Sequence, residues 1–435
     1  MRFKIIPLED KQIVYFPDSL RFFETNSDTI EILKEIELGK TYEYFYSKYQ
    51  NFDQNDYETL KGYCTEVAIN KVESEDINSL FRLVLNISNV CNMNCKYCYA
   101  GGGNYGDKEA LMDIDILDKI LCFFYKFYKD IEVIQLFGGE PTLNIKAIEY
   151  VCTYLKENNK HTIVSMVTNG TNLNDKLIDL ISKYHIYVTV SIDCSELHDY
   201  LRPFNSGEKT YELIKCNLNK LYHKTGQPGQ IEITYTRQHD IKGISIQNLL
   251  ESLNKDLDFE VFAHIAPVCT ENADYKLDNP KRFFESIDDY YKYLGTDKQM
   301  HYSYIDRFLK PLKEHEPSIR YCGAGVGTIA VDIYGNIYPC FYFVNNNEFL
   351  IGNVVTDNYE KIQHNLTNTQ KEYISYKRNE TEKCKECFAN TICYGCIGAN
   401  YSITGDAMLM SDFHCEWVKK GLEATLRNIV KNKHK

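Results

Sequence analysis

Three cysteines lie close together in the run CNMNCKYC, at Cys91, Cys95 and Cys98. Thiolates this close in sequence are poor candidates for separate disulfides, but they can surround one soft inorganic cluster. A four-iron cluster with three protein ligands leaves one iron free for chemistry. A zinc loop that lacks its fourth ligand is the alternative, and the spacing favours the iron–sulfur cluster.

Seven more cysteines crowd the C-terminal part of the chain. Four of them form the pattern C-x2-C-x5-C-x2-C from Cys384 to Cys396. A zinc ribbon also has two C-x2-C pairs, but these pairs normally lie much farther apart. Iron–sulfur ligation therefore suits this spacing better, with zinc as the alternative. The seven are Cys322, Cys340, Cys384, Cys387, Cys393, Cys396 and Cys415.

Polar or glycine-rich motifs follow three strand-like runs downstream of the first cysteines. They are Gly138-Gly139-Glu140-Pro141, Thr168-Asn169-Gly170 and Ser191-Ile192-Asp193. Each alone is an ordinary turn or loop. The carboxyl ends of parallel strands meet at one rim, however, and active sites form there. The sequence therefore predicts one site built from the cysteine run and these strand ends.

The segment that must position these residues alternates strands and helices from residue 80 onward. Six βα units in a row predict a parallel sheet, either curled as an open barrel or doubly wound. Helices are expected behind Asp113 and from near residues 144, 174, 210 and 242. The strand-like runs are 81–87, 133–137, 163–167, 186–192, 231–235 and 260–265.

The two ends of the chain differ from this central part. Residues 1–78 predict a small α+β unit with two strands, a helix capped by Asn26 and ended by Gly39, and two further helices. Residues 280–320 predict a helical connector. The remainder is irregular and Cys-rich, with a hairpin expected around Tyr334-Gly335.

The composition limits the possible partners. The 435 residues are 44% hydrophobic, enough for a large core and several domains. A net charge of −12 repels phosphate, so no nucleic-acid partner is expected. No apolar run has membrane-spanning length, and the N-terminus is short and charged for a signal peptide. We therefore expect no membrane partner and a cytoplasmic location, where sixteen cysteines indicate metal or redox work.

The spacing Cys91-x3-Cys95-x2-Cys98 resembles the signature of the radical S-adenosylmethionine (SAM) superfamily. The resemblance implies a [4Fe-4S] cluster whose open iron binds SAM, and reductive cleavage of SAM to a 5′-deoxyadenosyl radical. It assigns no catalytic acid or base. Arg202, in the run His198-Asp199-x2-Arg202, fits a structural salt bridge as well as a SAM contact. The SAM contacts that the resemblance implies are Tyr97, Gly138, Gly139, Glu140, Asn169, Ser191, Asp193 and Arg202.

The C-terminal cysteines resemble the SPASM extension of peptide-modifying radical SAM enzymes, although Cys396 comes one residue early. The resemblance implies two auxiliary [4Fe-4S] clusters, and hence three clusters in the chain. Thr328 stands where sulfatase-maturing relatives have a further cysteine, so the inner cluster has three matched ligands. Cys194 and Cys269 fall near the active rim. The implied ligands are Cys384, Cys387, Cys393 and Cys415 for the outer cluster, and Cys322, Cys340 and Cys396 for the inner one.

Residues 1–78 resemble, by pattern alone, the PqqD-like element that captures a leader peptide as an added strand. A generic docking domain is the alternative, and the acidic first helix disfavours a DNA-binding winged helix. The implied fold is α/β: a partial (β/α)6 TIM-like barrel with an N-terminal winged-helix-like α+β domain and a Cys-rich iron–sulfur domain. The implied domains are 1–78 for leader recognition, 79–279 for the radical SAM core, 280–320 for the connector and 321–435 for SPASM.

These resemblances predict a radical SAM enzyme that installs a cysteine thioether in a ribosomally synthesised precursor peptide. The expected partners are a precursor with a leader and an electron donor such as ferredoxin or flavodoxin. The alternatives are a carbon–carbon or carbon–oxygen cross-linking enzyme and a sulfatase-maturing-type dehydrogenase. A ferredoxin-like carrier is disfavoured by the open-iron motif. The thioether depends on an open fourth position in the inner cluster, for which Cys269 is the competing ligand.

Overall fold

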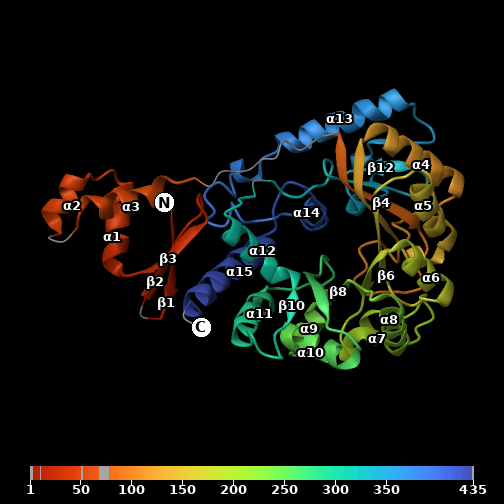
Figure 1. The fold of residues 1–435 in the computed structure, drawn as a ribbon, viewed down its shortest axis with the longest axis horizontal. Coiled ribbons are helices and arrows are strands. Elements are labelled where there is room, and N and C mark those ends of the chain that lie inside the picture. The colour runs from red at the N-terminus through yellow and green to blue at the C-terminus, as the bar shows by residue number, and fades with distance from the viewer. Residues whose placement is uncertain (1–2, 10, 50–51, 68–77, 319, 434–435) are drawn as a thin grey trace.

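The computed structural model describes residues 3–9, 11–49, 52–67, 78–318 and 320–433 (Figure 1). The expected boundary after the N-terminal unit adjoins residues 68–77, which lie outside the described residues. In space, the C-terminal part of the chain lies between the N-terminal unit and a large curved sheet. Within the described part of the chain, no helix is long and apolar enough to cross a membrane.

The N-terminal unit is a three-stranded antiparallel sheet followed by three helices. Asn26 caps the first helix by accepting a hydrogen bond from the Thr29 N–H, as the sequence predicts. The sequence does not predict β1, because Pro7 interrupts its apolar run, yet an edge strand tolerates proline. The elements are β1 (Lys4–Leu8), β2 (Lys11–Phe16), β3 (Arg21–Thr25), α1 (Ser27–Glu37), α2 (Tyr42–Lys48) and α3 (Gln54–Thr65).

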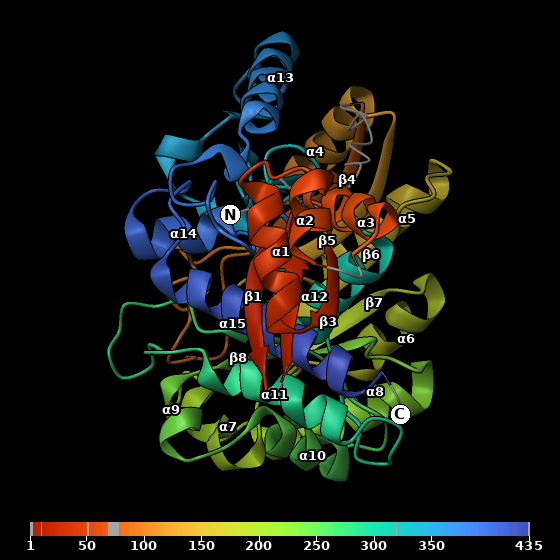
Figure 2. The same ribbon diagram turned by 90° about the vertical axis from the view of Figure 1, so that its left-hand side faces the viewer.

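The sheet of this unit is covered on both faces, because alternate side chains of a strand point to opposite sides. Phe16 packs with Phe45 in a core that belongs to the N-terminal unit. Ile13 and Tyr15 belong instead to the main core. The sheet thus lies between its own helices and α15 (Asp412–Lys431), as Figure 2 shows from the N-terminal side.

Six parallel strands with following helices form the centre of the molecule, and the helices cover the outer side of the curved sheet (Figure 1). Of the two arrangements that the sequence predicts, the structure therefore confirms the open, partial barrel and not the doubly wound sheet. The strands are β4 (Ser79–Ser88), β5 (Asp130–Gly138), β6 (Ile163–Thr168), β7 (Tyr187–Ser191), β8 (Gln230–Tyr235) and β9 (Phe262–Pro267). The helices are α4 (Ile114–Phe127), α5 (Ile145–Glu157), α6 (Asp175–Tyr184), α7 (Ser195–Leu201), α8 (Tyr211–Thr225), α9 (Arg237–Ile241) and α10 (Ile246–Asp256).

Alternation along β8 shows which side chains face the inside of the barrel. Ile231, Ile233 and Tyr235 are buried and alternate with Glu232. The Tyr235 hydroxyl donates a hydrogen bond to the Ile244 carbonyl, which lies just before α10. The odd-numbered residues of β8 therefore face the helices, and Glu232 faces the inside of the curved sheet.

The same sheet continues from β4 into the C-terminal part, which the sequence does not predict. The expected hairpin of β11 (Thr328–Val331) and β12 (Asn336–Tyr338) forms, and β11 also pairs in parallel with β4. Residues so far apart in sequence give no local signal of their pairing. Two short strands complete the sheet: β13 (Gly352–Asn353) beside β12, and β10 (His301–Tyr302) beside β9.

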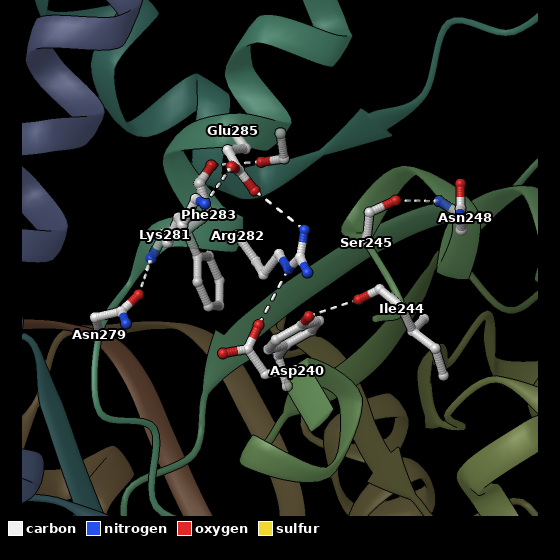
Figure 3. Close-up of polar contacts among 11 residues, drawn as sticks. Asp240, Ile244, Ser245, Asn248, Asn279, Lys281, Arg282, Phe283 and Glu285 are labelled. Carbon is white, nitrogen blue, oxygen red and sulfur yellow. Dashed lines mark hydrogen bonds and ion pairs between the residues drawn. The ribbon is translucent and has the colours of Figure 1, made fainter. Parts of the chain in front are cut away.

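The connector is helical, as predicted, and joins the barrel to the C-terminal part. Arg282 at the start of α11 pairs with Asp240 of α9 and with Glu285 (Figure 3). Both connector helices pack on α15. The connector helices are α11 (Lys281–Lys292) and α12 (Ser303–Glu314).

The C-terminal part adds the helices α13 (Tyr359–Ser375) and α14 (Ile397–Thr404). Short 3-10 turns occur at Pro141–Leu143 in the barrel and at Phe341–Phe343, Asn347–Phe349 and Arg378–Glu380 in the C-terminal part.

Candidate active site

The loop after β4 brings Cys91, Cys95 and Cys98 together. Main-chain bonds fix it to the end of α7 and the chain that follows; the Lys96 N–H, for example, donates to the Leu201 carbonyl at 2.9 Å. Burial raises the pKa of Cys91 to about 12, and the charges of Cys95 and Cys98 add to the rise. The thiols of Cys95 and Cys98 are therefore within electrostatic range of Cys91, and their role as ligands of one cluster stays a prediction.

Glycines stand where this loop meets neighbouring backbone. A Cβ on Gly103 would lie 2.7 Å from both the Cys91 Cβ and the Gly139 Cα. Gly138 has a φ of 131°, and a Cβ there would collide with the Ser88 carbonyl oxygen. Only glycine fits such contacts. The Gly-Gly pair thus lets the turn after β5 press against the end of β4, next to the cysteine loop.

Glu140 is fully buried, and its carboxylate accepts four hydrogen bonds. Thr142 donates from its N–H at 3.0 Å and its hydroxyl at 2.7 Å, Thr168 from its hydroxyl at 2.6 Å, and Asn169 from its N–H at 2.7 Å. Burial raises the pKa of Glu140, whereas these donors lower it. The side chain thus ties the turn after β5 to the end of β6, and its predicted contact with SAM stays a prediction.

Tyr97, Asp193 and Arg202 meet beside Cys95. The Tyr97 hydroxyl donates to Asp193 at 2.9 Å and accepts from Arg202 at 3.0 Å. Burial alone would lower the pKa of Arg202, but Cys95, Tyr97 and Asp193 raise it well above its usual value. Two buried atoms, Asp193 Oδ1 and Arg202 Nε, have no hydrogen-bond partner among the described residues. A ligand with both charges, such as SAM, would satisfy them.

The neighbouring run His198-Asp199 serves the fold. The Asp193 N–H donates to His198 Nδ1 at 3.0 Å, so Nε2 carries the proton and faces the Thr210 hydroxyl at 3.1 Å. Burial and then the charge of Arg202 lower the pKa of His198 well below its usual value. Asp199 accepts from the Thr210 N–H at the start of α8. Arg202 is therefore the member of this run that faces the site.

Asn169 and Ser191 stand at the ends of β6 and β7. The Asn169 amide donates to Asn92 at 2.9 Å and lies 3.8 Å from Cys91 Sγ. Ser191 is the register partner of Glu232 on β8. The structure thus brings the predicted SAM contacts of four strand ends to the rim that carries the cysteine loop.

The C-terminal cysteines form two groups. Burial raises the pKa of Cys393 to about 12, and the charges of Cys415, Cys387 and Cys384 add to it. Burial also raises the pKa of Cys340, and the charges of Cys396 and Cys322 add to this rise. Among the described residues, no three His, Cys, Asp or Glu side chains are arranged to hold a metal ion. Below, the term outer group refers to Cys384, Cys387, Cys393 and Cys415. The term inner group refers to Cys322, Cys340 and Cys396.

Sequence reasoning missed the cations around these groups. Arg307 of α12 lies 4.6 Å above the Trp417 ring. Burial lowers its pKa, while the charges of Cys393 and Cys396 act to raise it, which places the guanidinium near both groups. The side chain of Arg378 is fully buried, and its charge lowers the pKa of Cys393. No spacing rule links these arginines to the cysteines, because the contacts join distant segments.

Aromatic side chains lie between the cysteine loop and the inner group. The rings of Tyr99 and Tyr342 are 4.6 Å apart, and those of Tyr99 and Tyr105 are 6.2 Å apart. Burial raises the pKa of Tyr105, and the charges of Cys98 and Cys340 both contribute. Tyr105 is therefore near both cysteine sites. In a chain with 35 tyrosines, no sequence signal marks these three.

The two further cysteines near the rim have different surroundings. Cys194 is fully buried in the main core, and burial raises its pKa to about 12. Cys269 follows β9, and its Sγ lies 3.7 Å from the Ala399 carbonyl. Burial and then the charge of Cys396 raise its pKa to about 11. Cys269 therefore lies at the margin of the inner group.

Two family models match the chain. Residues 85–245 match the Radical SAM superfamily, and residues 322–388 match the SPASM iron-sulfur cluster-binding domain. The first match includes the cysteine loop and the strand ends with the predicted SAM contacts. The second begins at Cys322 and favours iron–sulfur ligation over the zinc alternative.

Relatives by sequence and by structure agree with these matches. The radical SAM cyclopropyl synthase TigE of Paramaledivibacter caminithermalis is 25% identical over 384 residues, which are 81% of this chain and 74% of that protein. An uncharacterized protein of Methanocaldococcus jannaschii is 33% identical over 142 residues, or 32% of this chain; the match spans about half of its length, 48%.

Two solved structures show the fold. The structure of anSMEcpe with bound AdoMet has a TM-score of 0.67 at 20% identity and covers 81% of this chain and 98% of that one. The structure of Streptococcus suis SuiB bound to precursor peptide SuiA has a TM-score of 0.56 at 18% identity, and the match covers 95% of this chain and 98% of SuiB. The fold and the matched segments define the class: the chain has a radical SAM domain and, C-terminal to it, a SPASM domain.

Proposed function

We propose that this enzyme forms a cross-link in a ribosomally synthesised precursor peptide. The observation that carries the proposal is the union, in one chain, of a radical SAM rim, two further cysteine groups and a docked N-terminal α+β unit. The structural relative SuiB is bound to a precursor peptide, which supports a peptide substrate. A sulfatase-maturing-type dehydrogenase would not need the N-terminal unit.

We assign the three cysteine sites to three [4Fe-4S] clusters. Cys91, Cys95 and Cys98 would hold the cluster that binds SAM, and the outer and inner groups would hold the auxiliary clusters. When bound and reduced by a donor such as ferredoxin or flavodoxin, SAM supplies a 5′-deoxyadenosyl radical that takes a hydrogen atom from the peptide. Asp193 and Arg202 support SAM binding with their unpaired buried atoms, and Asn169 braces the cysteine loop.

We assign leader recognition to the N-terminal unit. β3 is an edge strand of its sheet, and an edge strand can pair with an added peptide strand. The Thr391 hydroxyl donates to the Pro17 carbonyl at 2.7 Å, and Lys431 pairs with Glu9 at 2.8 Å. These contacts fix the unit against the C-terminal part, so a bound leader would lie in a set position relative to the cysteine groups.

The inner group supports a cysteine thioether as the product. It would offer three cysteines to a four-iron cluster, and Thr328 stands where sulfatase-maturing relatives have a further cysteine. One iron is then available to a peptide thiolate, because soft iron binds thiolate well and lowers the pKa of a thiol. A sulfur held there is in place for attack by a carbon radical of the peptide.

Cys269 supports a second candidate, a carbon–carbon or carbon–oxygen cross-link. The thiol lies near Cys396 and could complete the ligand set of the inner group. No iron would then be open to a peptide thiolate, and the inner cluster would serve electron transfer alone. The name of the relative TigE, a cyclopropyl synthase, fits carbon–carbon chemistry.

The test is anaerobic turnover of the reconstituted holoenzyme with SAM, a reductant and the full-length Cys-containing peptide encoded beside the gene. We expect 5′-deoxyadenosine and a peptide that has lost two hydrogens, with at least one cysteine that resists alkylation. If the peptide loses two hydrogens and every cysteine can still be alkylated, the product is not a thioether, and the carbon–carbon or carbon–oxygen cross-link becomes the proposed product. SAM cleavage without any change in peptide mass would reject the peptide as substrate.

Deleting residues 1–78 tests the leader assignment. We expect processing of the full-length precursor to stop while uncoupled SAM cleavage continues. The matched control is the intact enzyme with a leaderless peptide, which should also be left unprocessed. Normal processing by the truncated enzyme would place leader recognition elsewhere.

A further inference from the structure

Two glutamates lie at the inner rim of the barrel in contrasting surroundings. Burial raises the pKa of both Glu140 and Glu232. Glu140 is tied down by four hydrogen bonds. Glu232 keeps some solvent-exposed surface, and within the described residues no donor forms a hydrogen bond with its carboxylate. A carboxylate on the inner face of the barrel that has no donor from the described residues and keeps some access to solvent is available to a ligand.

The register of the sheet places Glu232 between two polar side chains. Ser191 on β7 and His264 on β9 are its register partners. Paired residues of neighbouring parallel strands point to the same face of a sheet. Ser191 ends the strand that leads to Asp193, so Glu232 lies next to the rim assigned to SAM.

The charges around Glu232 connect the SAM rim with the inner group. Burial raises the pKa of Glu232, and the charge of Arg202 opposes this rise. Burial also raises the pKa of Tyr342, and the charges of Cys396, Cys269, Cys340 and Glu232 all add to it. The carboxylate is thus within electrostatic range of both Arg202 and Tyr342. Arg202 belongs to the SAM rim and Tyr342 borders the inner group, so Glu232 is near both places where the proposed reaction acts on the peptide.

We propose that the Glu232 carboxylate accepts the proton that the peptide releases when the cross-link forms. The inference rests on the proposed function. Hydrogen-atom transfer to the deoxyadenosyl radical breaks a peptide C–H bond and leaves a carbon radical. Coupling of this carbon to an X–H group, where X is sulfur, oxygen or carbon, forms C–X and releases one proton and one electron. Glu232 takes the proton, and an oxidised iron–sulfur cluster takes the electron.

The neighbouring titratable groups are poorer acceptors. Arg202 is already protonated, and so is the Tyr342 phenol, because its pKa is raised well above its usual value. His264 is held through Nδ1 at 2.7 Å from the Ser303 hydroxyl, and burial followed by the charge of Arg307 lowers its pKa. The Glu232 carboxylate, whose pKa burial raises above its usual value, is better suited to accept a proton.

The experiment compares Glu232→Gln and Glu232→Asp with the wild-type holoenzyme on the full-length precursor. We expect E232Q to lower the rate of cross-linking about 100-fold or more, the usual scale for loss of a general base. Iron content and SAM binding should not change, and 5′-deoxyadenosine should still form, so the product per 5′-deoxyadenosine falls. In E232D, which keeps a carboxylate, the amount of product per 5′-deoxyadenosine should return to a large part of the wild-type value. Glu212→Gln, on the outer surface of α8, is the charge-matched control.

The possible outcomes separate this inference from the proposed function. If wild-type enzyme leaves the peptide unchanged, the proposed function fails and the inference fails with it. If wild-type enzyme forms the cross-link and E232Q matches it in rate and coupling, only the inference is overturned. A parallel loss of SAM binding and product in E232Q would also overturn it, because Glu232 would then support the SAM site.

Discussion

The outer and inner cysteine groups lie in one domain but have different surroundings. The outer group is near several cations: Lys383 and Lys419 lower the pKa of Cys415 against the effect of burial, and Arg378 does the same for Cys393. The inner group is bordered by Cys269 and Tyr342 and has one cation of its own, Arg82 near Cys340, while Arg307 is near both groups.

This difference indicates a division of work. Positive charge favours the more negative, reduced form of a cluster, so the outer group should have the higher reduction potential. The inner group is the one near Tyr342, which is also within electrostatic range of Glu232 on the barrel strand β8. We infer that the inner group serves the substrate and that the outer group receives electrons from it.

Removing whole ligand sets should have the largest effect. The wild-type enzyme should hold about twelve irons after anaerobic reconstitution, and a chain with Cys384, Cys387 and Cys393 changed to Ala should hold about eight. SAM cleavage should survive in that variant. The matched variant with Cys91, Cys95 and Cys98 changed to Ala should also hold about eight irons but lose SAM cleavage. About four irons with bound zinc in wild-type enzyme would contradict the assignment of both C-terminal groups.

An intermediate effect is expected from Arg307→Gln, because this guanidinium is near both groups. Losing one charge at about 7 Å in a medium of effective dielectric constant 20 should lower the nearby reduction potentials by roughly 100 mV. Potentiometric titration followed by electron paramagnetic resonance measures the shift. Lys420→Gln, an exposed cation on α15, is the control. Unchanged reduction potentials in R307Q would show that the charge of Arg307 does not influence either cysteine group.

Cys269→Ser should have the smallest effect if the inner group keeps an open iron. Iron content and the resonance spectrum should then match wild type, and thioether formation should continue. Loss of about four irons, or a changed spectrum of one cluster, would make Cys269 a ligand and favour the second candidate. Cys216→Ser, at an exposed cysteine of α8, controls for the loss of one thiol.

Much of the site could be predicted from the sequence, because its signals are local. The spacing of Cys91, Cys95 and Cys98 is covalent, and glycine-rich turns recur where strands end. The six strands with their helices were predicted by hydrophobic alternation and periodicity, and the structure confirms the open barrel. The ligand sets of the two C-terminal groups remain proposals, although their members do come near one another.

Other features could not be predicted because they depend on distant contacts. Glu232 alternates with isoleucines in its strand, a pattern that fits a solvent-facing side chain equally well; curling of the sheet decides that it faces the interior. The pairing of β11 with β4 brings Cys340 near the cysteine loop, yet neither strand carries a signal for the other.

The sequence by itself thus determined the cysteine spacings, the order of strands and helices and the class of enzyme. Only the tertiary structure decided which cations surround the outer group, that Cys269 borders the inner group and that Glu232 is near both Arg202 and Tyr342. The physical reason is that spacing and periodicity act over a few residues along the chain. Burial and electrostatic contact arise only when distant segments pack together.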